Sequence, residues 1–363
     1  MPEETLLSRI KSMISHQGPL SVAQYMALAL GDTNDGYYMR RDPLGADGDF
    51  TTAPEISQMF GEMVGAWLAA SWQQMSSPRG VALVELGPGR GTLMQDILRA
   101  TKHVSGFHSA ISVHMVVMSP ALIARQQETL KEITIPITWH STIDTLPRSP
   151  WLLVANEFFD ALPIHQFIKT KEGWRERMVI LGEGDEALTF KASGVPTIMT
   201  ARLPETVANA PENSIYELCP AATAITEEIT RHLVSHGGTA LLIDYGYTEP
   251  GTGDTLQAVK NHQYHPVLET PGKADLTAHV NFASLRTIAE QAGGIVYDRM
   301  SQGEWLMAMG IHLRYEFLCR NATESQKKIL ESEIERLTAP EQMGTLFQCM
   351  AITPPGYAAA YGF

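Results

Sequence analysis

The sequence predicts an α/β fold in which a mainly parallel sheet is covered by helices on both faces. In the middle of the chain, short apolar runs rich in β-branched residues alternate with amphipathic helical patterns, which is typical of βαβ units. A glycine-rich turn joins the first of these strands to its helix. The composition agrees, because 44% hydrophobic and 18% charged residues are ordinary for a chain with a substantial core.

The first part of the chain is expected to be helical and to precede the sheet. Apolar residues recur at helical spacing in three stretches, over residues 6–14, 21–30 and 56–75. The second stretch begins at Ser21, a residue type that caps helices. A long loop rich in glycine and aspartate, residues 31–55, separates the second helix from the third, and loops of that length are usually functional.

The central part supplies the sheet. Strands are expected at 81–86, 111–118, 151–156 and 239–245, and helices at 92–99 and 120–131. Alternating apolar and polar residues within 164–192 predict an antiparallel hairpin inserted beside the sheet. The expected division is therefore a helical or lid segment over 1–78 and a sheet domain over 79–363, with insertions at about 164–215 and 251–281.

The most informative segment is the turn after the first strand, VELGPGRGTL. Gly87, Gly89 and Gly91 alternate between Glu85 and a helix that begins near Thr92. Glycines permit a tight turn and close backbone approach to a ligand, and a helix N-terminus offers free N–H groups. The segment predicts a site for a nucleotide-like ligand; a structural turn without a ligand is the alternative.

The details of the turn discriminate between ligands. The dinucleotide pattern G-x-G-x-x-G requires a glycine where Thr92 stands, and a P-loop requires Gly-Lys-Ser or Gly-Lys-Thr, which this turn lacks. Glu85 would repel a pyrophosphate but attract a cationic amino group. S-adenosyl-L-methionine carries such a group, and we expect Glu85, Gly87, Pro88, Gly89, Gly91 and Thr92 to bind it.

Taken together, several motifs resemble those of the MidA-type methyltransferases, whose mitochondrial members act as complex I assembly factors. The similar segments include DFTTAPEIS, ELGPGRGTL, MSPALIARQ, ANEFFDALPIHQF, LLIDYGY and GKADLTAHVNF, and together they extend over nearly the whole chain. The resemblance implies a class I S-adenosyl-L-methionine-dependent methyltransferase, with a Rossmann-like sheet, a helical N-terminal segment and inserted hairpin and loop parts. It also implies methylation of an arginine in a protein substrate, with Thr52 and Pro54 near the cofactor and Tyr37 and Tyr38 in a lid.

One position departs from the family pattern. The family has an acidic residue two positions before Ser119-Pro120, where it would bind the ribose hydroxyls, whereas this chain has Val117. A valine cannot accept those hydrogen bonds. An assembly factor that has lost effective cofactor binding therefore stays open as an alternative. An NAD(P)-dependent oxidoreductase is the second alternative, and the absence of an acid here counts against it, because NAD requires an acid about twenty residues beyond its glycines.

Polar residues after two later strands predict the second wall of the site. Ligands of open α/β sheets bind at the carboxyl ends of the strands, where Asn156, Glu157 and Asp160 fall. Asn156 is expected to contact the cofactor, and Glu157 and Asp160 to orient the acceptor. Asp244, at the end of another buried strand, and His279, as a base, are further catalytic candidates; Asp160 as a turn cap and His279 as a packing residue are the alternatives.

Charge and cysteine content limit the partners. The net charge of −13 makes nucleic acid an unexpected partner and favours a protein substrate with a basic acceptor residue. No apolar run is long enough to suggest a membrane span, and neither the three distant cysteines nor the histidines form a metal-binding pattern. A cytoplasmic protein without a metal is the resulting expectation.

Overall fold

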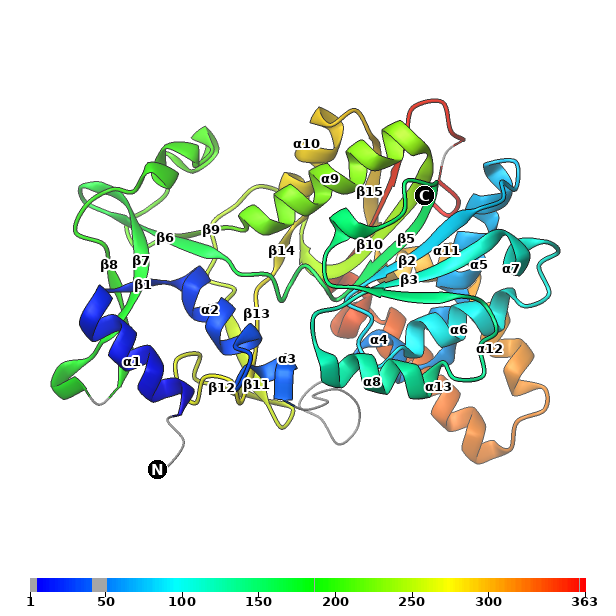
Figure 1. The fold of residues 1–363 in the computed structure, drawn as a ribbon, viewed down its shortest axis with the longest axis horizontal. Helices are drawn as coiled ribbons and strands as arrows, with labels where there is room; N and C mark the ends of the chain where they lie inside the picture. The colour runs from blue at the N-terminus through cyan, green and yellow to red at the C-terminus, as the bar shows by residue number, and fades with distance from the viewer. Residues whose placement is uncertain (1–4, 41–50, 186, 359) are drawn as a thin grey trace. The chain divides into compact units, whose positions relative to one another are not determined.

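The computed structural model describes residues 5–40, 51–185, 187–358 and 360–363. The chain folds into two compact units whose segments interleave along the sequence (Figure 1). Unit 1 comprises residues 1–50, 160–222 and 249–279, and unit 2 comprises residues 51–159, 223–248 and 280–363. Residues 41–50 of the expected long loop lie outside the described part of the chain.

Unit 2 is built on an eight-stranded sheet with the order β15-β16-β10-β5-β2-β3-β4, and β14 pairs with β10. Strands β4, β3, β2, β5 and β10 are parallel neighbours, whereas β16 runs antiparallel to both β10 and β15. The strands are β2 (Val81–Leu86), β3 (Ile111–Val116), β4 (Ile137–His140), β5 (Trp151–Asn156), β10 (Gly238–Tyr247), β14 (Val280–Asn281), β15 (Ile295–Ser301) and β16 (Phe347–Thr353).

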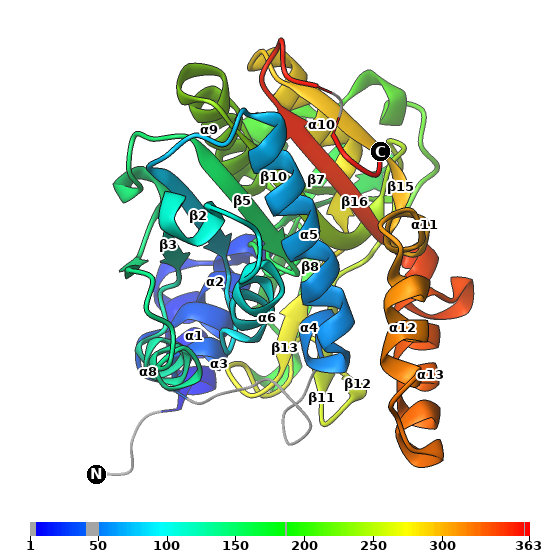
Figure 2. The same ribbon diagram turned by 90° about the vertical axis from the view of Figure 1, so that its right-hand side faces the viewer.

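Helices cover both faces of this sheet. Figure 2 shows α5 and α6 in front of the strands and α9 and α10 behind them. The helices of unit 2 are α4 (Ala53–Ile56), α5 (Gln58–Gln74), α6 (Thr92–Thr101), α7 (Phe107–Ala110), α8 (Pro120–Thr129), α9 (Pro220–His236, from residue 223 onward), α10 (Phe282–Gln291), α11 (Gln302–Ala308), α12 (Ile311–Cys319) and α13 (Glu324–Thr338). The predicted α/β sheet with helices on both faces is confirmed.

The strands form where apolar residues run without interruption, because helices exclude water from both faces. All six residues of β2 and all six of β5 are buried, and both strands have the predicted bounds. Strand β3 ends at Val116, earlier than predicted, because the Ser119 side chain accepts a hydrogen bond from Leu122 N and Pro120 starts α8.

The described residues of unit 1 form two antiparallel sheets and three α-helices, which share a core. A five-stranded sheet has the order β1-β7-β6-β9, with β8 on β7, and a three-stranded sheet has the order β12-β11-β13. Its elements are α1 (Leu6–Gln17), β1 (Leu20–Ser21), α2 (Val22–Gly31), α3 (Tyr37–Arg40), β6 (His165–Thr170), β7 (Gly173–Leu181), β8 (Leu188–Ala192), β9 (Ile215–Leu218), β11 (Gln257–Lys260), β12 (Gln263–His265) and β13 (Asp275–Thr277).

The structure groups the segments differently from the expected division at residue 78. The predicted hairpin within 164–192 is a three-stranded meander, β6 to β8, in a sheet separate from that of unit 2. Helices α1 and α2 share a core with Val179, Leu188 and Leu276, which come from the two inserted segments. The amphipathic face of each N-terminal helix is thereby buried within unit 1, whereas the helix at 58–74 packs on α6 in unit 2.

Candidate active site

The topology of unit 2 indicates a binding site at one edge of its sheet, the edge formed by the carboxyl ends of the parallel strands. The chain proceeds from β2 to β3 and β4 on one side, and then returns to β5 and β10 on the other side of β2. Ligands of open α/β sheets bind where the strand order reverses, at the carboxyl ends of the strands. Glu85 lies beside Val154 in this register, so the glycine turn after β2 and the residues after β5 meet at that edge.

The glycine turn has the backbone that the sequence predicts. Gly87, Gly89 and Gly91 have φ angles of 63°, 47° and 85°, in the region that favours glycine. A Cβ atom at Gly87 would lie 2.9 Å from Cδ2 of Phe158, so a side chain there would displace that ring. The Gly87 N–H donates to the Val116 carbonyl (3.1 Å) and the Gly91 N–H to the Pro88 carbonyl (2.8 Å), and α6 begins at Thr92.

Glu85 is the unusual group of this edge. It is 3% exposed, and its Oε2 atom has no hydrogen-bond partner among the described residues. Burial raises the pKa of this carboxyl to about 8, because removal of water disfavours its charged form. A buried carboxylate oxygen without a partner is costly, and a cationic amino group would satisfy it. The residues at this edge therefore fit the amino acid part of S-adenosyl-L-methionine.

The segment before α5 is tied to both strand ends. The Thr92 hydroxyl donates to Glu55 Oε1 (2.5 Å), and the Arg90 guanidinium lies 3.7 Å from Glu55 Oε2. The Ala53 N–H donates to Glu157 Oε1 (2.9 Å). Of the predicted cofactor contacts, Thr52 directly precedes α4, and Pro54 lies between Ala53 and Glu55, the two residues that make these links.

The first residues after β5 are held in a strained turn. Glu157 has a φ of 49°, which is uncommon for a residue with a side chain, and its N–H donates to the Ile243 carbonyl (2.9 Å). Asn156 Nδ2 donates to Glu157 Oε1 (3.1 Å), whereas Asn156 Oδ1 is buried and has no partner among the described residues. Strained backbone of this kind clusters at functional sites, which supports a role for this turn.

The carboxylate of Asp244 accepts hydrogen bonds from three backbone N–H groups. It is 1% exposed, and its Oδ2 accepts hydrogen bonds from the N–H groups of Phe158 (3.1 Å) and Phe159 (3.0 Å). Its Oδ1 accepts from the Tyr245 N–H (3.0 Å). Asp244 thus shapes the turn that presents Glu157, and its predicted role in holding an acceptor stays a prediction.

Two predicted catalytic residues, Asp160 and His279, belong to unit 1. Asp160 is buried, and its carbonyl accepts a hydrogen bond from the Ala278 N–H (3.0 Å). The His279 N–H donates to Thr255 Oγ1 (2.8 Å), and burial lowers the pKa of its imidazole.

Unit 1 also contains a pair that sequence reasoning did not connect. The Tyr38 hydroxyl donates to Asp275 Oδ1 (2.9 Å). Burial, followed by the charges of Asp275 and Asp160, raises the pKa of Tyr38 well above its ordinary value. No local pattern indicates this contact, because the two residues are 237 positions apart.

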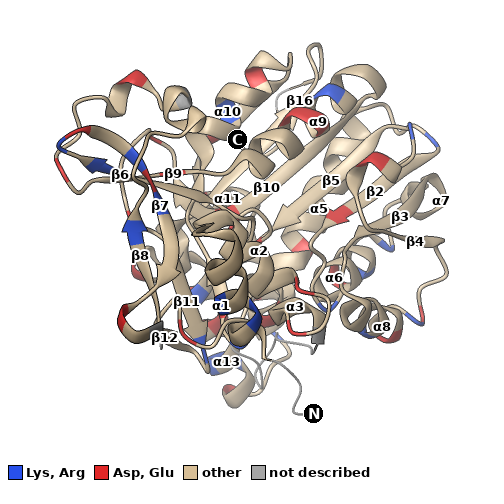
Figure 3. Cartoon of the chain, turned by 60° about the vertical axis from the view of Figure 1, so that its left-hand side comes forward, with Lys and Arg blue, Asp and Glu red and all other residues tan. Residues whose placement is uncertain are grey.

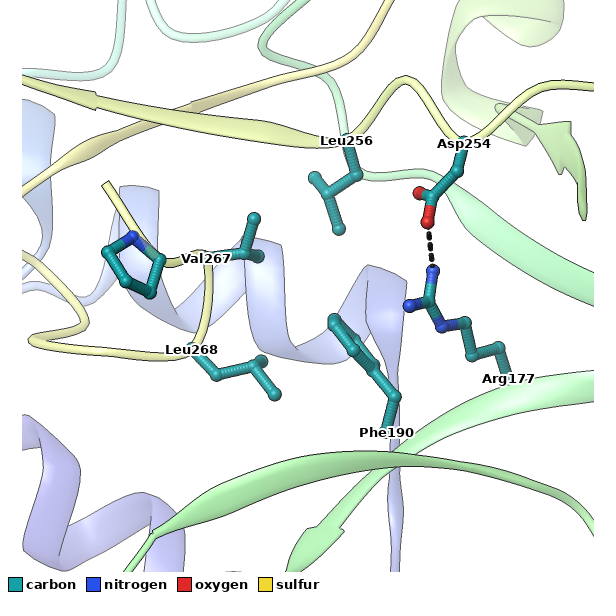
Figure 4. Close-up of a pocket in the computed structure, with 7 residues that line it drawn as sticks. Arg177, Phe190, Asp254, Leu256, Val267 and Leu268 are labelled. Atoms are coloured by element: carbon teal, nitrogen blue, oxygen red, sulfur yellow. Dashed lines mark hydrogen bonds and ion pairs between the residues drawn. The ribbon is translucent and has the colours of Figure 1, made fainter. Parts of the chain in front are cut away.

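A cavity of about 330 Å³ also lies in unit 1 (Figure 4). Its polar side is the Arg177–Asp254 ion pair (2.8 Å), and the Arg177 guanidinium lies over the Phe190 ring. Apolar side chains form the rest of its wall: Leu256, Pro266, Val267 and Leu268. None of the predicted site residues is among the described residues that line it.

Over the described ranges, no three His, Cys, Asp or Glu side chains gather closely enough to hold a metal ion. None of the helices in the described part of the chain is both long and apolar enough to span a bilayer.

Comparison with known proteins identifies similar chains. Residues 63–300 match the model of a family described as "Putative S-adenosyl-L-methionine-dependent methyltransferase". The chain is 38% identical to the zebrafish (Danio rerio) "Protein arginine methyltransferase NDUFAF7, mitochondrial" over 96% of its own length and 87% of that protein. It is 36% identical to the human protein of the same name, over 97% of this chain and 84% of the relative.

A solved structure is similar over almost the whole chain. A protein from Burkholderia thailandensis, bound to S-adenosyl-homocysteine, superposes with a TM-score of 0.85 at 26% identity. The similarity covers 98% of this chain and 93% of that one. S-adenosyl-homocysteine is what remains of S-adenosyl-L-methionine after its methyl group has left, so the neighbour holds the product form of the expected cofactor.

The comparisons overturn the expected cytoplasmic location, because the zebrafish and human relatives are named as mitochondrial proteins. The expectation rested partly on three separated cysteines, Cys219, Cys319 and Cys349. Unpaired cysteines suit a reducing environment, and this property does not distinguish one reducing compartment from another.

Proposed function

We propose that this chain, which belongs to the family of S-adenosyl-L-methionine-dependent methyltransferases, methylates an arginine side chain of a protein. Its cofactor is S-adenosyl-L-methionine, and it has the class I methyltransferase fold. The observation that carries the choice of acceptor is the relationship to proteins named as protein arginine methyltransferases, at 38% and 36% identity over nearly the full chain. The resemblance to the MidA-type family extends the proposal to a subunit of respiratory complex I.

The proposed cofactor-binding residues lie at the edge of the sheet where β2 and β5 end. Glu85 would pair with the amino group of S-adenosyl-L-methionine, and the turn from Gly87 to Gly91 would accommodate its main body. Thr52, Pro54, Thr92 and Asn156 complete the proposed set. When bound, the cofactor supplies an electrophilic methyl group on a positively charged sulfur.

The proposed acceptor chemistry requires carboxylates. A guanidinium is protonated at neutral pH and is planar, so acidic side chains are needed to hold it in one orientation. We assign this task to Glu157 and Asp160, and we assign to Asp244 the support of the turn that carries Glu157. Methylation of a guanidinium releases one proton, and we assign its acceptance to the imidazole of His279.

The charge of the chain is compatible with a basic substrate. The chain carries 40 Asp and Glu against 27 Lys and Arg. Figure 3 shows acidic and basic residues interspersed over the strands and helices. A net charge of −13 attracts a basic polypeptide segment over longer distances than the contacts themselves.

The two alternatives raised by the sequence have less support. An NAD(P)-dependent oxidoreductase would need the third glycine of the dinucleotide pattern, and the compared proteins are named as methyltransferases. A factor without cofactor binding would have no need for a buried carboxylate oxygen that lacks a protein partner, as Glu85 Oε2 does among the described residues.

The direct test is a search for the methylated residue. Mass spectrometry of the proteome from a strain that lacks this gene should show the loss of methylation at one arginine, and expression of the wild-type chain should restore it. Loss at a lysine or a glutamine instead, or at no site, would contradict the proposal.

The role of Glu157 can be tested by measuring the rate of methyl transfer to the arginine that this search identifies. Glu157→Gln keeps the shape of the side chain but removes its charge, and it should lower the rate of methyl transfer by about 100-fold. Binding of S-adenosyl-homocysteine, measured by calorimetry, should change by less than about threefold. Glu172→Gln, at an acid of the turn between β6 and β7 that is 81% exposed, is the matched control and should transfer at the wild-type rate. Wild-type turnover in Glu157→Gln would remove this residue from the mechanism.

A further inference from the structure

Helix α8 carries a completely buried glutamine that contacts the glycine turn. Gln126 is 0% exposed, and its Nε2 donates to the carbonyl of Gly89 (2.7 Å). Its Oε1 accepts a hydrogen bond from the indole Nε1–H of Trp139 in β4 (2.9 Å). Both ends of the buried amide are therefore satisfied, as burial of a polar group requires.

Trp139 determines which end of the amide faces the turn. An indole nitrogen only donates, so the oxygen of Gln126 must face Trp139. The amide nitrogen must then face Gly89, whose carbonyl only accepts. Rotation of the amide by 180° would place two donors together at Trp139 and two acceptors together at Gly89, so the chain of contacts has a single stable direction.

The turn needs such an external contact, because its own geometry leaves one peptide plane undetermined. Gly89 has a φ of 47°, and a glycine rotates with little steric hindrance. The hydrogen bond from Gly91 N–H to the Pro88 carbonyl closes the turn but does not orient the carbonyl of Gly89. In a trans peptide the carbonyl of Gly89 and the N–H of Arg90 point in opposite directions. A carbonyl held toward α8 therefore directs the Arg90 N–H away from α8.

The neighbouring glycine adds to the contact. A Cβ atom at Gly91 would lie 3.4 Å from Cγ of Gln126, so the helix packs closely against the turn at this point. Gln126 thus fixes the turn in two ways, by a hydrogen bond at Gly89 and by close packing at Gly91.

We infer that Gln126, oriented by Trp139, is a positioning residue that sets the peptide plane between Gly89 and Arg90 and thereby determines the affinity for S-adenosyl-L-methionine. The inference rests on the proposed function in one respect, namely that the glycine turn binds the cofactor. If the contact is lost, the plane can rotate and present a carbonyl where this structure has the N–H of Arg90. Binding then has to select the correct state from a mixture, which lowers the apparent affinity.

The test measures the Kd for S-adenosyl-homocysteine by calorimetry on the full chain. Gln126→Met has a similar shape but no hydrogen-bonding amide, and it should raise Kd about tenfold or more. Trp139→Phe should raise Kd by about threefold, because the amide then has no fixed orientation. Gln95→Met is the matched control: the side chain of Gln95 in α6 also donates to a backbone carbonyl, that of Thr129, and not to the glycine turn. The substitution keeps the backbone N–H of Gln95, which donates to the Gly91 carbonyl, so Kd should stay unchanged.

A second variant separates positioning from general packing. In Gln126→Glu, a protonated carboxyl can donate its O–H to the Gly89 carbonyl, whereas the ionised form cannot. The ratio of the variant's affinity to the wild-type affinity at the same pH should therefore fall as the pH rises from 6 to 8. In steady-state assays of methyl transfer, Gln126→Met should raise KM for S-adenosyl-L-methionine more than it lowers kcat.

Wild-type affinity in both Gln126→Met and Trp139→Phe would overturn the inference, as would a reduced melting temperature with unchanged Kd. If Gln126→Met does not fold, Trp139→Phe and Gln126→Glu provide the same comparison. Failure of the proposed function is distinguishable from failure of this inference, because the first is read from the identity of the methylated residue and the second from Kd. If Glu85→Gln weakens binding but the Gln126 variants do not, only the role of Gln126 is lost.

Discussion

Two buried glutamates in different units differ in their hydrogen bonds: one accepts several, and the other has a carboxylate oxygen without a partner among the described residues. Glu217 of β9 in unit 1 is 6% exposed, and Glu85 of β2 in unit 2 is 3% exposed. Burial raises the pKa of both. Glu217 accepts hydrogen bonds from Gln166 Nε2 (2.7 Å), from the Thr255 N–H (3.0 Å) and from the Thr255 hydroxyl. In the described part of the chain, Oε2 of Glu85 accepts none.

The difference in hydrogen bonding indicates a different role for each acid. Three donors lower the cost of burying Glu217, so it can hold β9 to the segment at Thr255 in the absence of any ligand. Glu85 carries a larger uncompensated cost, which a cationic ligand would remove. Equal burial therefore accompanies two different roles, one in the stability of unit 1 and one, as we propose, in cofactor binding.

The largest expected effect comes from exchanging both acids for amides. Glu85→Gln should weaken the binding of S-adenosyl-homocysteine by about 10- to 100-fold, because a charge-assisted contact is lost. Glu217→Gln should leave that Kd unchanged and should reduce the free energy of unfolding by about 1–3 kcal/mol. Calorimetry and thermal unfolding measure the two quantities. If Glu217→Gln weakened cofactor binding and Glu85→Gln did not, the proposed difference in role between the two acids would be wrong.

A smaller effect is expected when an acid is added at the same edge. Val117 follows β3 directly and is half-buried, and its N–H donates to the His140 carbonyl (2.9 Å). Val117→Glu introduces the carboxylate that the family pattern has there, and it should tighten the binding of S-adenosyl-L-methionine about tenfold. Met118→Glu is the control, because Met118 is 71% exposed, and it should leave Kd unchanged. Unchanged affinity in Val117→Glu would show that this position does not contact the ribose.

The smallest effect is the pH dependence. Because the folded pKa of Glu85 is about 8, above its ordinary value of 4.5, the folded chain binds more protons than the unfolded chain between these values. The contribution of Glu85 to stability therefore falls as the pH rises from about 4.5 to about 8. Thermal unfolding of the ligand-free chain should show this slope, and Glu85→Gln should reduce it.

Cofactor binding should have the opposite sign. A cation beside Glu85 lowers the pKa of this group, so binding releases a proton and the affinity increases as the pH rises from 6 to 8. Calorimetry in two buffers with different ionisation enthalpies measures the released proton. No release, together with a flat affinity profile, would show that Glu85 is not paired with the amino group.

The sequence was informative where neighbours along the chain are also neighbours in space. Strands β2 and β5 were predicted with their bounds, because only two residues separate the apolar run 81–84 from Gly87 and only one separates the apolar run 151–155 from Glu157. The glycine turn was recognisable because its residues are contiguous. The links from Thr92 to Glu55 and from Gln126 to Gly89, each 37 positions apart, have no local pattern and were not predicted.

By itself the sequence determined the alternation of strands and helices, the glycine turn and the acid beside it, because short-range sterics and apolar periodicity act along the chain. Only the tertiary structure decided that three separate segments form unit 1 and that β15 and β16 complete the sheet of unit 2. It also decided that Glu217 has three donors, whereas Oε2 of Glu85 has none among the described residues. Donors and packing partners of this kind come from distant parts of the chain, and they meet only when the core closes.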